Sequence, residues 1–132
     1  MNKKSDCITE GIRIMVDPEY IPGELVSTNG KYLFSYRVRI VNEGDLPAQL
    51  ISRHWIIINS EGKTENVLGE GVVGRQPKLN PGEEFKYTSY CPLDTPWGTM
   101  EGTFQMIRND GSEFNAVIER FYLVSPEAAN EG

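Results

Sequence analysis

The stretch Phe34-Ser35-Tyr36-Arg37-Val38-Arg39-Ile40 decides the fold of this chain. Its apolar and polar residues alternate strictly, and a period of two is typical of a β-strand with one face against a core and one in solvent. The pattern therefore predicts that Phe34, Tyr36, Val38 and Ile40 face a hydrophobic core.

The same alternation returns on both sides of this stretch. It occurs in Gly11–Ile14, Glu84–Thr88, Met100–Met106 and Phe114–Ile118. A further run, Leu50–Ile58, ends apolar on both sides, which predicts a central strand that is covered on both faces.

Turn signals separate these runs. They are Asn29-Gly30, Asn42-Glu43-Gly44-Asp45, Ser60-Glu61-Gly62-Lys63, Pro81-Gly82 and Asn109-Asp110-Gly111. Asp110-Gly111 tolerates the positive φ angles of a type I′ turn, so the last two strands are expected to form an antiparallel hairpin.

The 13 Gly and 8 Pro fall wherever a long helix would have to run. Several short strands without a helix predict an all-β fold, an antiparallel β-sandwich.

Length and composition agree with one such domain. The 132 residues, 39% hydrophobic and 24% charged, are enough for a self-sufficient core. We expect a single domain over 1–132 with its core at about 9–124, and frayed, polar ends at 1–8 and 125–132.

The net charge and the cysteines of the chain indicate its class of partner and its cellular compartment. Thirteen basic against 19 acidic residues give a net charge of −6, which argues against nucleic acid or an anionic membrane as partner. Because no secretory signal or spanning apolar run is present, we expect a cytoplasmic protein. Cys7 and Cys91 form no disulfide framework or metal motif and are expected to be reduced thiols.

Gly69-Glu70-Gly71-Val72-Val73-Gly74 matches the dinucleotide-binding pattern G-x-G-x-x-G. That fingerprint needs a helix after the glycines to offer its N-terminus to a pyrophosphate. Here Pro77 and the turn at Asn80-Pro81-Gly82 prevent a helix, so dinucleotide binding in this manner is rejected. A glycine loop between strands is expected instead.

Two interpretations of this loop stay open. The glycines can serve bulges or tight crossings of the backbone. Alternatively, successive N–H groups can form an anion-binding nest. The residues of this candidate site for a phosphate-rich ligand are Gly69, Gly71, Gly74, Arg75 and Arg53.

Groupings that would indicate an enzyme are sparse. His54 is the single histidine and would need Ser52 or Ser89 as its nucleophile, but a histidine on a strand face is more often a packed neighbour. A zinc site from His54, Cys7 and Cys91 lacks ligand spacing. We expect no catalytic residues, no metal site and no cofactor.

Aromatic and polar residues instead suggest a surface for recognition. Arg53-His54-Trp55 lies in a predicted strand, and Thr95-Pro96-Trp97 lies in a predicted loop, where recognition residues are common. The candidate interaction residues are His54, Gln76, Thr95, Pro96 and Trp97. For Trp55, packing in the core is the favoured explanation.

Five segments together resemble the ApaG family. They are Arg53–Ile57, Gly69–Pro77, Leu79–Gly82, Tyr87–Ser89 and Cys91–Met100, in this order. The resemblance extends from about Thr9 to Leu123. Two positions depart from the family pattern, because Tyr90 replaces a small residue and Glu119 replaces a common proline.

The resemblance implies a fibronectin type III-like or immunoglobulin-like sandwich in a bacterial protein. It also implies a link to diadenosine polyphosphate metabolism or to tolerance of cobalt and magnesium, and no established catalytic activity. Eukaryotic relatives of the family look like protein-interaction modules. We therefore expect a non-enzymatic module that binds a protein partner, as a monomer or homodimer. Binding or weak hydrolysis of pyrophosphate or nucleotides at the glycine loop is the alternative.

Overall fold

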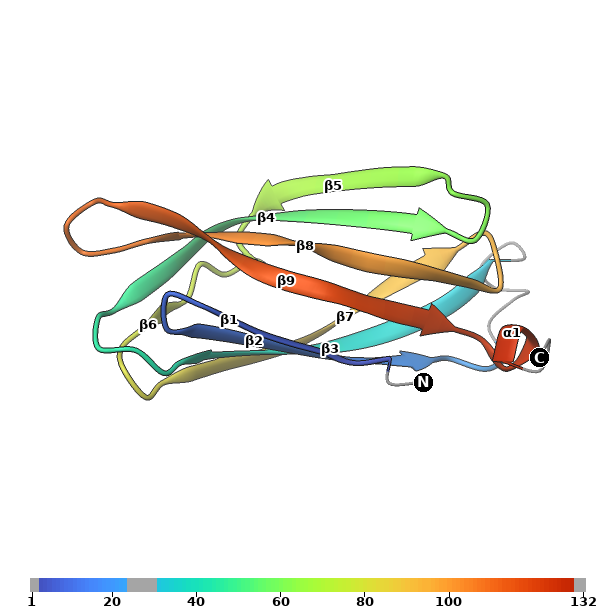
Figure 1. Cartoon of the computed structure of the whole chain (residues 1–132), viewed down its shortest axis with the longest axis horizontal. Coiled ribbons are helices and arrows are strands. Elements are labelled where there is room, and N and C mark those ends of the chain that lie inside the picture. Colours follow the sequence, from blue (N-terminus) through green and yellow to red (C-terminus); the bar gives the residue numbers. More distant parts are fainter. Residues whose placement is uncertain (1–2, 24–30, 130–132) are drawn as a thin grey trace.

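The computed structural model describes residues 3–23 and 31–129 and consists of two antiparallel sheets that face each other (Figure 1). The first sheet has the order β1-β2-β3-β7, with bounds Ser5–Thr9, Ile12–Tyr20, Tyr32–Asn42 and Glu84–Leu93. The second has the order β5-β4-β8-β9, with bounds Thr64–Glu70, Ala48–Asn59, Trp97–Ile107 and Glu113–Val124. The short β6 (Lys78–Leu79) pairs with β4, and one helical turn, α1 (Pro126–Ala129), follows β9. The antiparallel β-sandwich is thus confirmed, whereas its likeness to fibronectin type III domains stays a prediction.

The core lies between the two sheets, where the alternation placed it. Phe34, Tyr36, Val38 and Ile40 of β3 are all buried. At the centre, the Trp55 ring lies 5.3 Å from that of Tyr36 and about 6 Å from those of Phe104 and Phe121, measured between ring centroids. Edge-to-face aromatic pairs at such distances stabilise a core beyond the area that they bury. Trp55 is therefore a core residue and not part of a recognition surface.

The strand at Leu50–Ile58 is central, as predicted, because β4 lies between β5 and β8. The expectation that both of its faces are covered is wrong. Ile56 and Ile58 point away from the core and are only half-buried, because no layer of the described chain packs over the outer face of this sheet. This leaves apolar side chains beside His54 in contact with solvent.

The hairpin between β8 and β9 is confirmed, but its turn differs from the expected one. Gly111 N–H donates to Arg108 O (3.0 Å), and Arg108 N–H donates to Ser112 O (2.8 Å). Only Gly111 has a positive φ, of 87°, so the loop Asn109–Gly111 is a three-residue turn with a glycine bulge and not type I′. Ser112 N–H and Oγ both donate to Asp110 Oδ1, which fixes this turn.

The expectation of a frayed N-terminal end over 1–8 is wrong for residues 5–8. Residues 5–8 belong to β1, which pairs with β2, and the Arg13 guanidinium donates to both carboxylate oxygens of Asp6 (2.8 and 2.6 Å). Hydrogen bonds from Tyr122 N–H to Lys3 O (3.0 Å) and from Val117 N–H to Thr9 Oγ1 (3.1 Å) join this segment to β9. The strand was missed because Ser5–Thr9 carries almost no apolar alternation.

The C-terminal end is fixed in a similar way up to residue 129. Ser125 is buried, and its N–H donates to Pro96 O (2.9 Å). Ala129 N–H donates to Ser125 O (3.0 Å), which closes the single turn of α1. The expected turn at Asn29-Gly30 and the ends at 1–2 and 130–132 lie outside the described residues.

Candidate binding surfaces

The glycine loop follows β5 directly and leads into β6, without a helix between them. Val72 and Arg75 exchange two backbone hydrogen bonds of 2.8 and 2.9 Å, and Val73 and Gly74 between them both have positive φ (45° and 77°). Two successive positive φ angles are the mark of a type I′ turn. The motif is therefore a tight turn between strands, as its flanks predicted.

Two of the glycines leave room for close backbone and side-chain approaches. A Cβ at Gly71 would lie 2.3 Å from the carbonyl oxygen of Arg75. A Cβ at Gly69 would lie 2.8 Å from the guanidinium of Arg53. Gly74 has open space around it and serves the positive φ instead. These positions support the backbone interpretation of the motif.

The groups proposed to hold an anion are directed elsewhere. Arg53 Nη1 donates to the carbonyl oxygens of Glu70 (3.0 Å) and Gly71 (2.8 Å). The N–H groups of Gly71, Val72 and Arg75 donate to backbone carbonyls. Arg75 lines a shallow hollow of about 480 Å³ that also includes Glu83 and Glu84 but not Arg53. The structure does not bring the five residues together as anion donors, and the anion site stays a prediction.

The candidate interaction residues lie at three separate places. Gln76 holds the glycine loop to β4, because its side chain donates to Ile51 O (2.9 Å). Thr95 is buried, and its hydroxyl accepts from Ser60 N–H (3.1 Å) and donates to Trp97 O (2.7 Å), so it shapes the turn before β8. Trp97 is exposed and follows half-buried Pro96. It lies six residues along β8 from Thr103, the residue that pairs with His54. At about 3.3 Å per residue, Trp97 thus lies about 20 Å from His54 along the sheet.

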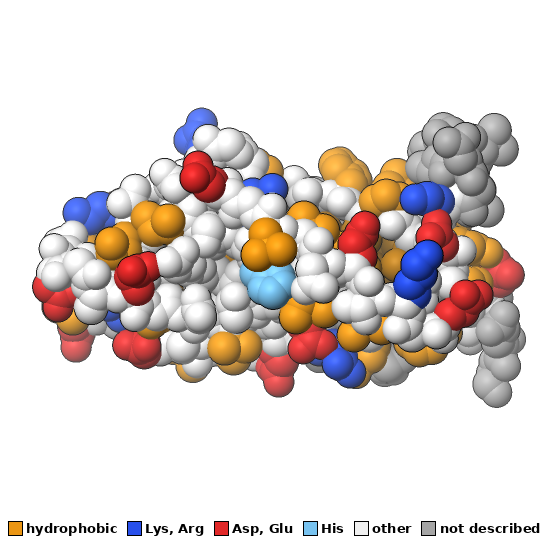
Figure 2. Space-filling view, turned by 90° about the horizontal axis from the view of Figure 1, so that it is seen from above, with side chains coloured by type: hydrophobic (Ala, Val, Ile, Leu, Met, Phe, Trp, Pro, Cys, Tyr) orange, Lys and Arg blue, Asp and Glu red, His pale blue; other side chains and the backbone are white. Residues whose placement is uncertain are grey.

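His54 lies in the middle of the outer face of the second sheet. Its ring nitrogen Nε2 is 2.8 Å from Asn66 Oδ1, and neighbouring Ser52 donates its hydroxyl to Gln105 (2.7 Å). The strand register aligns Leu68, His54, Thr103 and Val117 in one row across four strands. Hydrophobic side chains lie directly beside the histidine on this face (Figure 2). We name these four residues the outer row.

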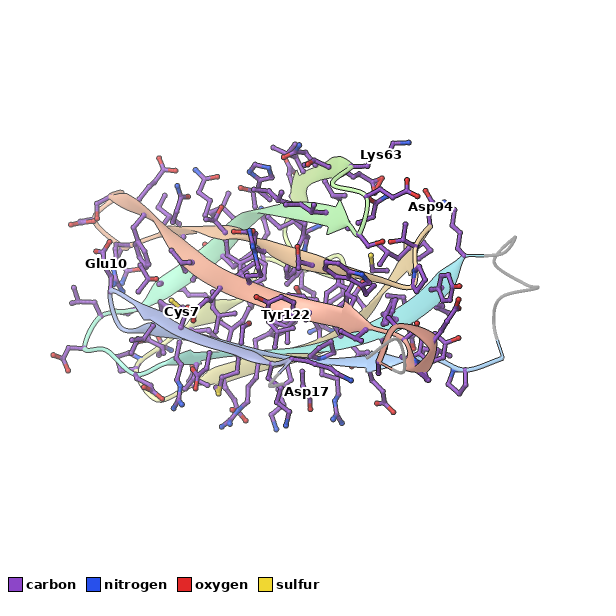
Figure 3. All side chains as sticks on the ribbon, turned by 45° about the vertical axis from the view of Figure 1, so that its right-hand side comes forward. Cys7, Glu10, Asp17, Lys63, Asp94 and Tyr122 are labelled. Atoms are coloured by element: carbon purple, nitrogen blue, oxygen red, sulfur yellow. The ribbon has the colours of Figure 1, made fainter. Side chains whose placement is uncertain are left out.

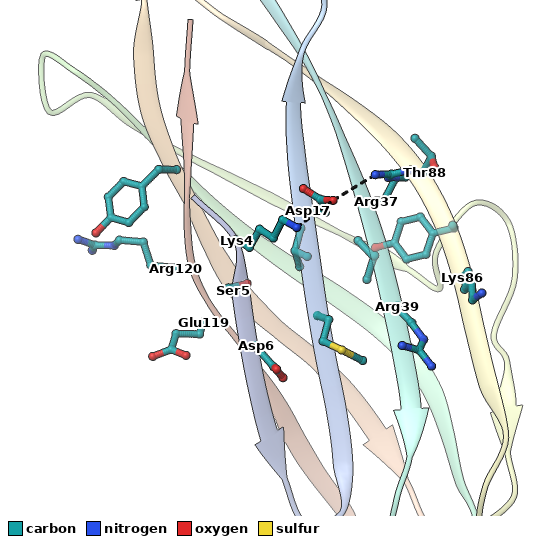
Figure 4. A pocket seen from close by; sticks show the side chains of 15 residues that line it. Lys4, Ser5, Asp6, Asp17, Arg37, Arg39, Lys86, Thr88, Glu119 and Arg120 are labelled. Carbon is teal, nitrogen blue, oxygen red and sulfur yellow. Dashed lines mark hydrogen bonds and ion pairs between the residues drawn. The ribbon is translucent and has the colours of Figure 1, made fainter. Parts of the chain in front are cut away.

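The first sheet has a different outer face, on the opposite side of the molecule. In Figure 3, Asp17 lies on this outer face, whereas Lys63 lies on the side of the second sheet. A hollow of about 1150 Å³ opens on it, shown in Figure 4. Its charged lining is Lys4, Asp6, Asp17, Arg37, Arg39, Lys86, Glu119 and Arg120. Sequence reasoning missed this site, although the polar positions Arg37 and Arg39 of the β3 pattern pointed to a charged outer face.

Hydrogen bonds to cations lower the pKa of two carboxylates near this face. The Arg39 side chain, with Lys86 beside it, lowers the pKa of Glu84, and the Arg13 side chain lowers the pKa of Asp6. Both carboxylates are therefore ionised at neutral pH. A bulge in β9 places Glu119 and Arg120 opposite Glu101 of β8. Arg120 donates two hydrogen bonds to the Glu101 carboxylate (2.9 and 2.7 Å).

Among the described residues there is one buried free thiol, that of Cys91. Burial raises the pKa of the Cys91 thiol to about 12, which keeps it protonated and unreactive at neutral pH. No group of three His, Cys, Asp or Glu side chains in residues 3–23 and 31–129 is arranged to hold a metal ion. In the same part of the chain, no helix has the length and apolar character to cross a membrane.

Comparisons with known proteins agree on one family. A family model described as the ApaG domain matches residues 23–108. A protein named ApaG from Anaeromyxobacter dehalogenans is 52% identical over 126 residues, which are 96% of this chain and 99% of that protein. A crystal structure from Bordetella pertussis is similar, with a TM-score of 0.83, 46% identity, and coverage of 91% of this chain and 98% of that one.

Proposed function

This chain belongs to the ApaG domain family, as its motifs predicted, and from that premise we propose that it is a non-enzymatic module that binds another protein. The observation that carries the proposal is the outer row. Leu68 exposes 71% of its surface and Val117 exposes 42%, on either side of His54 and Thr103. Exposed apolar side chains that gather on one rigid face mark sites of protein association.

The edge position of β5 supports the same proposal. Asn59 N–H donates to Lys63 O (3.0 Å) and Gly71 N–H donates to Ile51 O (2.8 Å), so the odd-numbered residues of β5 face β4. In an antiparallel ladder the backbone groups of alternate residues point the other way. Thr64, Asn66 and Leu68 therefore direct their N–H and C=O groups outward, where a partner strand can pair with them.

Affinity capture followed by mass spectrometry tests this function. We expect a specific protein to be retained by the wild-type chain and lost with Leu68→Ser or Val117→Ser, because each change removes apolar area from the contact. Leu46→Ser is the matched control, since Leu46 is also exposed (61%) but lies in the β3–β4 loop. Retention of the same proteins by all variants would contradict a role of the outer row.

The cellular setting that we propose rests on the family resemblance alone. It is diadenosine polyphosphate metabolism or tolerance of cobalt and magnesium, in which the partner protein would act. Assays of the captured partner for phosphate-ester hydrolysis or cation transport test this setting.

The alternative, binding or weak hydrolysis of a phosphate-rich ligand at the glycine loop, is the weaker proposal. Arg53 already donates to two carbonyl oxygens, and three of the loop N–H groups are hydrogen-bonded within the chain. Calorimetry with pyrophosphate and magnesium tests it, and we expect no binding heat at millimolar ligand.

A further inference from the structure

The hollow on the outer face of the first sheet concentrates positive charge in an acidic protein. Its lining contains five cationic side chains, from Lys4, Arg37, Arg39, Lys86 and Arg120. The three carboxylates of the lining come from Asp6, Asp17 and Glu119. Together with their direct ion-pair partners Arg13, Glu84 and Glu101, these side chains sum to one positive charge, in a chain that carries −6 in total. Such segregation favours the approach of an acidic partner to this face.

Ion pairs inside the hollow leave donor capacity for a ligand. Asp17 is shared by Arg37 (3.1 Å) and Lys4 (3.7 Å), as the dashed lines in Figure 4 show. Glu84, at the rim, is shared by Arg39 (2.6 Å) and Lys86 (3.4 Å). The single negative charge of Glu84 thus balances only one of its two cations.

The cations also remain accessible. The side chains of Arg37 and Lys86 are each 66% exposed. An arginine has five N–H donors, and the structure shows one of those of Arg37 in use, toward Asp17.

We propose that this hollow binds an extended acidic segment of the protein partner, an inference that rests on the binding function proposed above. Arg37 and Arg39 lie two residues apart on β3, and Lys86 pairs with Arg39 across the β3–β7 ladder. Side chains two residues apart on a strand are separated by about 7 Å. An extended peptide with acidic residues at alternate positions presents its carboxylates at the same spacing.

The carboxylates of the hollow favour a peptide over a nucleic acid or a phosphate chain. Asp6, Asp17 and Glu119 lie among the cations and repel a ligand with a continuous row of negative charges. A peptide spaces its carboxylates and offers backbone N–H groups between them, which can donate to these aspartates and glutamates. The hollow is thus complementary to mixed acidic and donor groups.

Fluorescence anisotropy with a labelled peptide of alternating Glu and Ser tests the proposal. We expect the wild-type chain to bind it more tightly than a peptide of the same composition with Glu and Ser in separate blocks. Because the attraction is electrostatic, binding should weaken from low ionic strength to about 0.15 M salt. Amide chemical-shift changes should map to β2, β3 and β7.

Charge reversal identifies the residues involved. We expect the double variant Arg37→Glu and Lys86→Glu to weaken binding roughly tenfold or more, since it removes two attractions and adds two repulsions. Lys63→Glu is the control: Lys63 is exposed beyond the opposite sheet, and its reversal should change affinity by less than about twofold (Figure 3). Circular dichroism on each variant verifies the fold.

Three results would overturn the inference. They are no binding of the alternating peptide, an equal effect of Lys63→Glu, or tighter binding of polyphosphate or single-stranded DNA than of the peptide. Failure here is distinguishable from failure of the proposed function. If Leu68→Ser abolishes partner capture while no peptide binds, the module still binds protein but this hollow does not take an acidic segment.

Discussion

Position 71 has no room for a side chain. Gly71 has a φ of +64°, and its Cβ would meet the Arg75 carbonyl that accepts the Val72 N–H. Gly71→Ala should therefore lower the free energy of unfolding by at least about 2 kcal/mol, because it adds a backbone clash to an unfavourable φ.

Gly74→Ala provides the matched comparison for this prediction. Gly74 also has a positive φ, but its Cβ would enter open space. Gly74→Ala should lower the free energy of unfolding by only about 1 kcal/mol, which is roughly the cost of the left-handed conformation alone. Urea unfolding of the two variants measures the difference, and equal losses would refute the role of Gly71 as a close crossing.

The buried Cys91 thiol makes the free energy of unfolding depend on pH in the alkaline range. Burial raises its pKa to about 12 in the folded protein, whereas an unfolded thiol has a pKa of about 8.5. Between these values the unfolded state loses a proton that the folded state keeps, so the free energy of unfolding should fall by up to about 1.4 kcal/mol per pH unit. At neutral pH the thiol is protonated in both states and has no such effect.

Denaturant titrations at several pH values above 8 check this prediction. Cys91→Ala should lose part of the slope, but not all of it, because burial also raises the pKa of Tyr36 and of Tyr87. An unchanged slope in Cys91→Ala would show that the thiol titrates normally in the folded chain.

At the scale of elements, alternation predicted the strands whose inward positions are a run of apolar residues, and it gave no signal for β5. It predicted β3, β7 and the β8–β9 hairpin because their inward positions are apolar. It missed β1, whose pairing with β2 depends on backbone hydrogen bonds and the Asp6–Arg13 ion pair. Such pairing between short segments leaves no hydrophobic period in the sequence.

The same limit applies to the candidate surfaces. His54 and Arg37 were visible as polar residues on strands, but the outer row and the hollow each combine four or more strands. Their composition depends on strand order and register, which are set by contacts between distant segments. The roles of Gln76 and Thr95 in fixing turns were hidden for the same reason, since their hydrogen-bond partners are distant in the sequence.

The position of β1 between β2 and β9 leads to a prediction about truncation. Removal of residues 1–9 would expose the edge of β2 and the groups of Val117 and Tyr122 that bond to this segment. We expect the free energy of unfolding to fall by about 2 kcal/mol or more, because apolar side chains of β2 also lose cover. Thermal unfolding against a chain that lacks only residues 1–2 is the measurement, and equal midpoints would show that β1 is dispensable.

At the scale of the whole molecule, the sandwich separates two kinds of surface. The outer row, with its exposed Leu68 and Val117, belongs to the second sheet, and the basic hollow belongs mainly to the first, with the core between them. Packed sheets lie about 10 Å apart, and the core that joins them is closely packed and rigid. A partner that uses both surfaces would therefore have to wrap around one side of the sandwich.

This separation predicts that the two surfaces act independently. Leu68→Ser should leave the affinity for the alternating Glu-Ser peptide unchanged within about twofold, since distant sites without shared contacts have additive effects. For binding to the captured partner, Leu68→Ser and the double variant Arg37→Glu and Lys86→Glu should each reduce the binding free energy. The two reductions should be additive within about 0.5 kcal/mol. A double-mutant cycle by titration calorimetry measures both quantities. A coupling well above that value would mean that one surface responds to occupation of the other through the core, in which case the sandwich transmits binding between its faces.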